Sequence, residues 1–122
     1  MSTYEIIDQL LVIRESSSGE VIWKGKPLDC NVKKMESLEK QVGCIVLLDV
    51  EDFSKSDYRY LRNLIAIDGD GNIIWYAKLP ESIDFFVDFD WIDNKLLANS
   101  WSGFRLQIDI ANGKTIDRVF TK

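Results

Sequence analysis

A five-residue segment that occurs three times constrains the fold of this chain more than any other feature. The three copies are GEVIW at 19–23, GNIIW at 71–75 and GKTID at 113–117. Each copy begins with glycine and follows a β-like run that ends in polar turn residues. The glycines are 52 and 42 residues apart. The shorter spacing fits the roughly 40 to 50 residues of one propeller blade. Since closed propellers need about four blades or more, three copies predict an open structure.

The sequence between the copies also has the pattern of antiparallel strands. CIVLLDV at 44–50 has no polar alternation, which predicts a central strand buried on both faces. Residues 85–92 alternate in polarity and predict a strand with one buried face. The residues expected on that face are Phe85, Val87, Phe89 and Trp91. Trp23 and Trp75, which end two of the repeated segments, are also expected in the core.

One segment, NVKKMESLEKQV at 31–42, is open to two interpretations. A short helix would place Met35, Leu38 and Val42 on one side, whereas an edge strand and loop would turn Val32, Met35 and Leu38 inward. We favour the strand and loop because the surrounding sequence is β-rich. The prediction is therefore a single all-β, mainly antiparallel domain over residues 1–122. Its form is an open, propeller-like half-propeller or a curved β-sandwich, and a short helix at 31–42 is the alternative.

The stretch AIDGDGNIIW at 66–75 could open a calcium loop or form a hairpin turn. Asp68, Asp70 and Asn72 fit the first three ligand positions of an EF-hand loop. However, Ile73 stands where that loop needs glycine and Leu79 where it needs a bidentate glutamate. The flanking residues are β-branched and aromatic, as in a hairpin. We therefore predict a turn, and no metal or other cofactor.

The residue types present exclude several kinds of catalysis. The chain contains no histidine, which removes Ser-His-Asp and Cys-His nucleophiles and histidine metal ligands. No spacing singles out a pair of catalytic carboxylates. The two cysteines, Cys30 and Cys44, lack metal-ligand spacing and are expected to be buried thiols in a reducing compartment. We predict no catalytic residues and a protein that is not an enzyme.

The lengths of the apolar runs indicate whether the protein enters a membrane or is secreted. The longest run, CIVLLDV, is far shorter than the roughly 20 residues that cross a bilayer. The first residues, MSTYEIIDQLLVIRE, have neither the basic start nor the cleavage site of a secretory signal. A cytoplasmic protein that does not enter the membrane is expected.

Charge is concentrated in one stretch, which makes it a candidate contact surface. Residues 79–94 contain five acidic and no basic residues, so their net charge of −5 equals that of the whole chain. Asp84, Asp88 and Asp90 are expected to share one face of a strand, where they could dock a basic partner. The alternative is an ordinary solvated strand face. Direct nucleic-acid binding is not expected, because such affinity comes from basic groups.

Three aromatic residues are further candidates for partner contact. Tyr58 and Tyr60 belong to the long polar stretch EDFSKSDYRYLRN at 51–63, and Trp101 ends a predicted strand. Interfaces are enriched in tyrosine and tryptophan, so these side chains could contact a partner.

The motifs also resemble known families. LIAIDGDGNIIW at 64–75 resembles the turn-and-tryptophan motif of PQQ-type propeller blades. Over residues 44–122, the succession CIVLLDV, NLIAIDGDGNIIWYAKLP and LLANSWSGFRLQIDIANGKTIDRVFTK is similar to small bacterial half-propeller-like proteins. That group looks like immunity proteins of contact-dependent growth inhibition and related polymorphic toxin systems.

The resemblance implies a protein that binds and neutralises a cognate toxin domain by occluding its active site. The acidic stretch suits a basic nuclease as that toxin. We expect a monomer, or a weak dimer formed through open sheet edges. The alternative function is a small-ligand-binding or scaffold β domain that inhibits nothing, and a carboxylate-based hydrolase is a more remote one.

Overall fold

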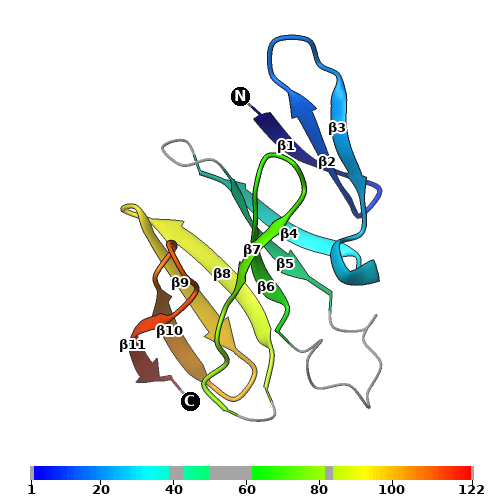
Figure 1. Cartoon of the computed structure of the whole chain (residues 1–122). Coiled ribbons are helices and arrows are strands. Elements are labelled where there is room, and N and C mark those ends of the chain that lie inside the picture. Colours follow the sequence, from blue (N-terminus) through cyan, green and yellow to red (C-terminus); the bar gives the residue numbers. More distant parts are fainter. Residues whose placement is uncertain (1, 39–42, 50–61, 82–83, 122) are drawn as a thin grey trace.

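The three repeated segments lead into the last strands of three separate antiparallel sheets (Figure 1). The computed structural model describes residues 2–38, 43–49, 62–81 and 84–121. The first sheet contains β1 (Ser2–Ile7), β2 (Leu10–Glu15) and β3 (Val21–Gly25). The second contains β4 (Val32–Ser37), β5 (Cys44–Leu48), β6 (Leu64–Ile67) and β7 (Ile73–Tyr76). The third contains β8 (Phe86–Ile92), β9 (Lys95–Ser100), β10 (Phe104–Ile108) and β11 (Thr115–Phe120). A 3₁₀ turn, η1 (Pro27–Asp29), links the first two sheets.

The turn before each last strand has the same backbone hydrogen bonds. In the second sheet, Asp68 N donates to Asn72 O at 2.9 Å, and Gly71 N donates to Asp68 O at 3.2 Å. The corresponding residues of the other turns are Glu15, Gly19 and Glu20, and Asp109, Gly113 and Lys114. Gly19, Gly71 and Gly113 have φ values of +74°, +88° and +77°, where a side chain would be strained. The predicted hairpin turn at 66–75 is therefore confirmed, and related turns, each one residue longer, precede β3 and β11.

Tryptophans from these segments join one sheet to the next. Trp23 of β3 packs so closely on the second sheet's turn that a Cβ at Gly71 would lie 2.5 Å from its ring. In the same way, a Cβ at Gly113 would lie 2.7 Å from Trp75 of β7. Trp75 Nε1 also donates to Ile110 O at 2.8 Å. Asp117 stands at the corresponding position of β11.

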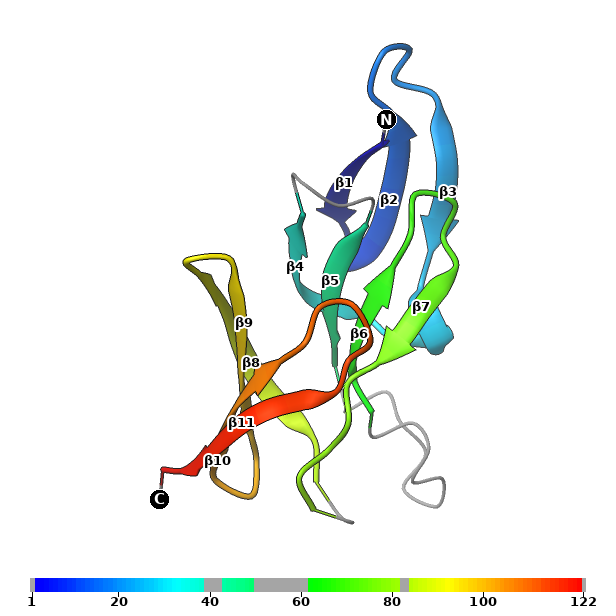
Figure 2. The same ribbon diagram turned by 60° about the vertical axis from the view of Figure 1, so that its left-hand side comes forward.

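The second sheet lies between the other two and is buried on both faces (Figure 2). Every residue of β5 and β6 is buried, which confirms the predicted central strand. On one face, Val46, Leu48, Ile65 and Ile67 pack with Leu11 and Ile13 of the first sheet. On the other face, Ile45, Leu47, Leu64 and Ala66 pack with Phe86, Phe89, Leu96, Ala98, Leu106 and Ile108 of the third sheet. Because β-strand side chains alternate, one sheet contributes to both cores.

The structure settles the two interpretations of 31–42 for the part that it describes. Residues 32–37 form β4, which pairs with β5 from Val32↔Leu48 to Ser37↔Cys44. The helix alternative is wrong there, because the main-chain groups of β4 bond to β5 instead of to one another. Residues 39–42 lie outside the described part.

The predicted alternation in β8 is only partly correct. Phe89 is buried and Trp91 packs against the core, but Val87 is exposed and Phe86 is buried. A register shift between Phe86 and Asp88 explains the difference, since one extra residue in a strand reverses the alternation on one side of it. Cys30 and Cys44 are buried thiols, as predicted. The described residues include no helix with the length and apolarity to cross a membrane.

Candidate partner-binding site

An exposed tryptophan stands at the turn between β9 and β10. Trp101 is 56% exposed, although its ring stacks on that of Phe85 with 5.8 Å between centroids. Its main-chain N–H donates to Phe85 O at 2.8 Å. Val87, at the start of β8, is also exposed. These contacts hold an aromatic side chain in a fixed position while most of it faces solvent.

Asp84 holds this turn from inside the protein. Asp84 is buried, and its Oδ1 accepts hydrogen bonds from Ser102 N at 3.0 Å and from Phe85 N at 2.9 Å. Its Oδ2 accepts a hydrogen bond from Ser102 Oγ at 2.5 Å. Ser102 Oγ also lies 3.0 Å from Ser100 Oγ. The expectation that Asp84 lies on an exposed face is thus wrong, because the aspartate satisfies the polar groups of the turn that presents Trp101.

A buried amide fixes the start of β8 from the second sheet. Asn63 Nδ2 donates to Leu48 O at 3.1 Å and to Phe86 O at 2.7 Å. Asn63 Oδ1 accepts a hydrogen bond from Phe86 N at 2.8 Å. The side chain therefore joins β5 to β8 and satisfies both main-chain groups of Phe86, which lies on the outermost strand of its sheet. The sequence analysis missed Asn63, because a single polar residue before a strand looks like the end of a loop.

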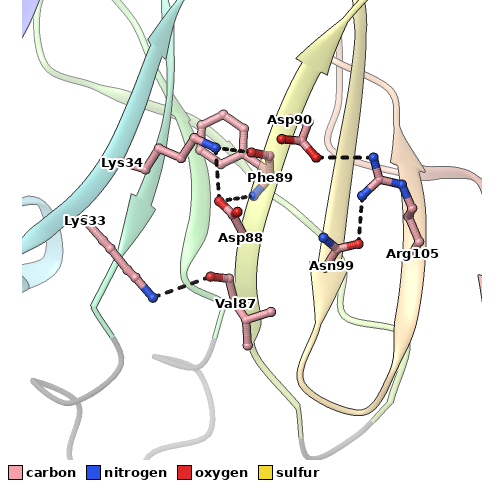
Figure 3. Close-up of polar contacts among 8 residues, drawn as sticks. All are labelled: Lys33, Lys34, Val87, Asp88, Phe89, Asp90, Asn99 and Arg105. Atoms are coloured by element: carbon pink, nitrogen blue, oxygen red, sulfur yellow. Dashed lines mark hydrogen bonds and ion pairs between the residues drawn. The ribbon is translucent and has the colours of Figure 1, made fainter. Parts of the chain in front are cut away.

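Asp88 is exposed and Asp90 is partly exposed, and each has a basic partner (Figure 3). Lys34 Nζ lies 3.0 Å from Asp88 Oδ1 and also donates to Phe89 O. Arg105 lies 3.2 Å from Asp90 Oδ2 and donates to Asn99 Oδ1 at 2.9 Å. The hydrogen bond from Lys34 is the main reason that the pKa of Asp88 is lowered.

These pairs divide the expected acidic row into separate contacts. Figure 3 shows Asp88 turned toward Lys34 of β4 and Asp90 turned toward Arg105 of β10. Their side chains are still 54% and 42% exposed. The basic residues come from other strands, so a charge count along residues 79–94 alone did not include them. Asp88 and Asp90 can still contact a partner, but they are not an unpaired acidic patch.

The remaining predicted positions are divided between turn, loop and undescribed segments. Tyr58 and Tyr60 lie outside the described residues. The Asp68 carboxylate accepts hydrogen bonds from Asp70 N and Asn72 N, both at 2.9 Å, so it stabilises its own turn. Within residues 2–38, 43–49, 62–81 and 84–121, no three His, Cys, Asp or Glu residues are grouped in a way that could hold a metal.

Fold and surface together define an open, propeller-like β domain that presents a rigidly held aromatic side chain. Residues 25–120 match the family described as "Domain of unknown function (DUF7957)", so this chain belongs to the DUF7957 family. No curated protein matches the sequence.

Solved structures with similar folds share little sequence with this chain. The computationally designed Ika4 protein has a TM-score of 0.64 at 9% identity, covering 94% of this chain and 63% of that one. The designed Ika8 protein has a TM-score of 0.60 at 9% identity, covering 98% and 36%. BamB from Moraxella catarrhalis, a propeller, has a TM-score of 0.55 at 13% identity, covering 98% and 35%. This chain thus spans less than two thirds of each of them.

Proposed function

We propose that this protein is an immunity protein that binds a toxin domain in the cytoplasm and covers its active site. The observation that carries the proposal is Trp101, which is exposed and yet held by Phe85 and by the Asp84–Ser102 hydrogen bonds. Tryptophan side chains that are ordered before binding lose little entropy on contact and are common hot spots of interfaces. The resemblance of residues 44–122 to immunity proteins supports the same function.

Asp88 and Asp90 would contribute at the edge of this interface. Both carboxylates are half-exposed and can exchange Lys34 and Arg105 for basic groups of a nuclease. Exchange replaces one ion pair by another, so the gain in affinity is smaller than an unpaired acidic row would give. The main electrostatic benefit would be a faster encounter with a basic partner at low salt.

The proposal is tested by titration calorimetry against the C-terminal domain encoded by the gene immediately upstream. We expect a one-to-one complex, weakened about 30-fold or more by Trp101→Ala, the loss typical of a hot-spot residue. Ile74→Ala is the matched control, because Ile74 is 51% exposed on the last strand of the second sheet. Asp88→Asn with Asp90→Asn should reduce the salt dependence of binding more than the affinity at high salt.

Two results would contradict the proposal. Absence of binding at low and high salt would favour the scaffold or ligand-binding alternative, which predicts thermal stabilisation by a metabolite. Equal losses of affinity for Trp101→Ala and Ile74→Ala would mean that the Trp101 surface has no special part in binding.

A further inference from the structure

The last strand of the third sheet has a free edge that is exposed along its whole length. β11 is the outermost strand in the order β11-β10-β9-β8. All six of its residues are exposed, and Ile116, Val119 and Phe120 are 57–58% exposed. The strand contains no proline. An exposed edge with apolar residues offers its main-chain groups to another strand, and proteins usually protect such edges.

The last strands of the other two sheets, β3 and β7, each pack against a later turn, whereas β11 does not. The turn containing Gly71 packs on Trp23 of β3, and the turn containing Gly113 packs on Trp75 of β7. Lys78 N, just beyond β7, also donates to Gly113 O at 3.1 Å. β11 has Asp117 instead of tryptophan, and no later sheet of the described chain packs against it. Among the described residues, β11 therefore lacks the turn contact that β3 and β7 have.

The direction of the free main-chain groups follows from the pairing with β10. Thr121 N donates to Gly103 O at 2.7 Å, and the register includes Arg105↔Val119 and Gln107↔Asp117. Since main-chain groups alternate in direction along a strand, those of residues 117, 119 and 121 point toward β10. The alternation is regular only from Asp117 onward, because Ile116 is the extra residue at the register shift between β10 and β11. The groups of Arg118 and Phe120 point to the free edge, where Arg118 N donates to Asp117 Oδ1 at 2.9 Å, a local bond that an added strand would replace. Two successive sites for ladder hydrogen bonds are thus present.

A groove runs beside this strand and is mostly basic. Residues 78–80 and 114–118 line a cavity of about 630 Å³. Figure 2 shows β11 and the segment after β7 diverging from one another. The lining contains the three basic side chains of Lys78, Lys114 and Arg118 but only one acidic side chain, that of Asp117. The apolar part of the lining includes Leu79 and Ile116.

A second copy of β11 is a poor occupant of the edge. Two antiparallel copies would pair through the outward-facing residues 118 and 120. In full overlap, Arg118 of one copy lies opposite Arg118 of the other. A shift of two residues in one direction places Asp117 opposite Asp117, and in the other direction it pairs only residues 118–120 of the two strands. Like charges directly opposite one another destabilise a strand pair.

We propose that the free edge of β11 binds an extended, acidic segment of another polypeptide, which adds to the third sheet as a fifth strand. Acidic side chains of the segment pair with Lys78, Lys114 and Arg118, and apolar ones alternate with them to contact Leu79 and Ile116. The main-chain bonds supply affinity and the groove supplies selectivity. This site is separate from the Trp101 surface and does not depend on the toxin.

The test is a selection of short random peptides displayed against the full chain, followed by fluorescence anisotropy with the enriched peptides. We expect aspartate or glutamate alternating with β-branched residues. Arg118→Pro removes one outward N–H without touching the bonds to β10, and it should weaken binding by about tenfold more than Arg118→Ala does. Lys114→Glu should also weaken binding, whereas Trp101→Ala should not.

An independent measurement covers the case in which Arg118→Pro perturbs folding. The same peptide, N-methylated at alternate amides, cannot form the edge bonds and should lose binding to the unaltered protein. The proposal is overturned if no peptide is enriched, if the enriched peptides are basic, or if N-methylation has no effect. A dimer in sedimentation equilibrium that Arg118→Pro dissociates would also overturn it, in favour of a second copy.

Discussion

At the scale of single residues, the carboxylate of Asp84 controls how Trp101 is presented. The Asp84 carboxylate accepts three hydrogen bonds, from Phe85 N, Ser102 N and Ser102 Oγ. A buried carboxylate that accepts several hydrogen bonds stabilises its surroundings only while every donor remains paired. The same residue that looked like part of a docking face is a support for the turn behind that face.

Asp84→Asn should therefore lower stability, whereas the same change at Asp90 should not. An amide NH₂ in place of Oδ2 cannot accept the hydrogen bond that Ser102 Oγ donates, and the charge-assisted bonds are lost. We expect the free energy of unfolding in urea to fall by about 1–3 kcal/mol. For Asp90→Asn, at a half-exposed ion pair, the fall should be below about 1 kcal/mol. Equal effects of the two substitutions would contradict the supporting role of Asp84.

Cys44 makes stability depend on pH in the alkaline range. Burial raises the pKa of its thiol to about 12, above its ordinary value in the unfolded chain. The unfolded state loses this proton first, so the stabilisation is complete below about pH 9 and is lost as the pH rises toward about 12. From pH 7 to about 10.5, the protein should lose about 2 kcal/mol more stability than Cys44→Val does.

The unaltered protein must be compared with Cys44→Val because ionisation of Tyr4 also lowers stability as the pH rises. Burial is the main cause that raises the pKa of Tyr4 to about 12. Tyr4 is present in both proteins, so its contribution cancels in the difference between their urea unfolding curves. Parallel pH profiles for the two proteins would show that the Cys44 thiol is not protected from ionisation.

At the scale of secondary structure elements, the turns with their glycines organise each sheet. The repeated segments predicted these turns correctly, since glycine and acidic residues mark them locally. The packing of Trp75 on Gly113, 38 residues later, could not be predicted from those signals. Nor could the bulge in β8, because Phe85, Phe86 and Val87 are all apolar and fit either register, and only tertiary packing selects the shifted one.

Gly19 and Gly113 form a matched pair for measuring the tryptophan contact. Their φ values are +74° and +77°, but a Cβ at Gly19 would meet nothing within 4 Å. At Gly113 the same Cβ would lie 2.7 Å from Trp75 and 2.9 Å from Tyr76 O. Gly19→Ala should cost about 1–2 kcal/mol from the backbone alone, and Gly113→Ala about 1–3 kcal/mol more.

Urea unfolding of the two variants measures this difference directly. A Trp75→Phe background provides a further control, because the smaller ring should reduce the excess cost at Gly113 and leave that at Gly19 unchanged. If Gly19→Ala and Gly113→Ala are equally destabilising in the native background, the ring contact contributes nothing to the joint between the sheets.

At the scale of the whole molecule, the predicted open all-β form is correct because it depends on repeat number and strand content alone. On the third sheet, Arg105 donates hydrogen bonds to Asn99 and to Asp90, so the three residues form one polar network. The sequence analysis could not find this network, or the Lys34–Asp88 pair, since 54 residues separate that lysine and aspartate. Ion pairs between distant residues leave no local sequence pattern. Their presence changed the predicted candidate site more than the predicted fold.

Removing the first sheet should expose the core of the second. Leu11 and Ile13 cover Val46, Leu48 and Ile65, all of them fully buried. A chain of residues 25–122, which retains the matched family region, should self-associate and melt at a lower temperature. Size-exclusion chromatography and thermal unfolding would show this. A monomer with an unchanged melting temperature would mean that the second and third sheets form an independent unit.

The direction of the tryptophan contacts has a consequence for synthesis. Trp23 and Trp75 each pack on a glycine that lies 48 and 38 residues further along the chain. During synthesis on the ribosome, the rings of Trp23 and Trp75 therefore stay uncovered until the later turn has been made. Asp117 ends this dependence. The third sheet therefore leaves no indole ring of this kind uncovered once its own strands have formed.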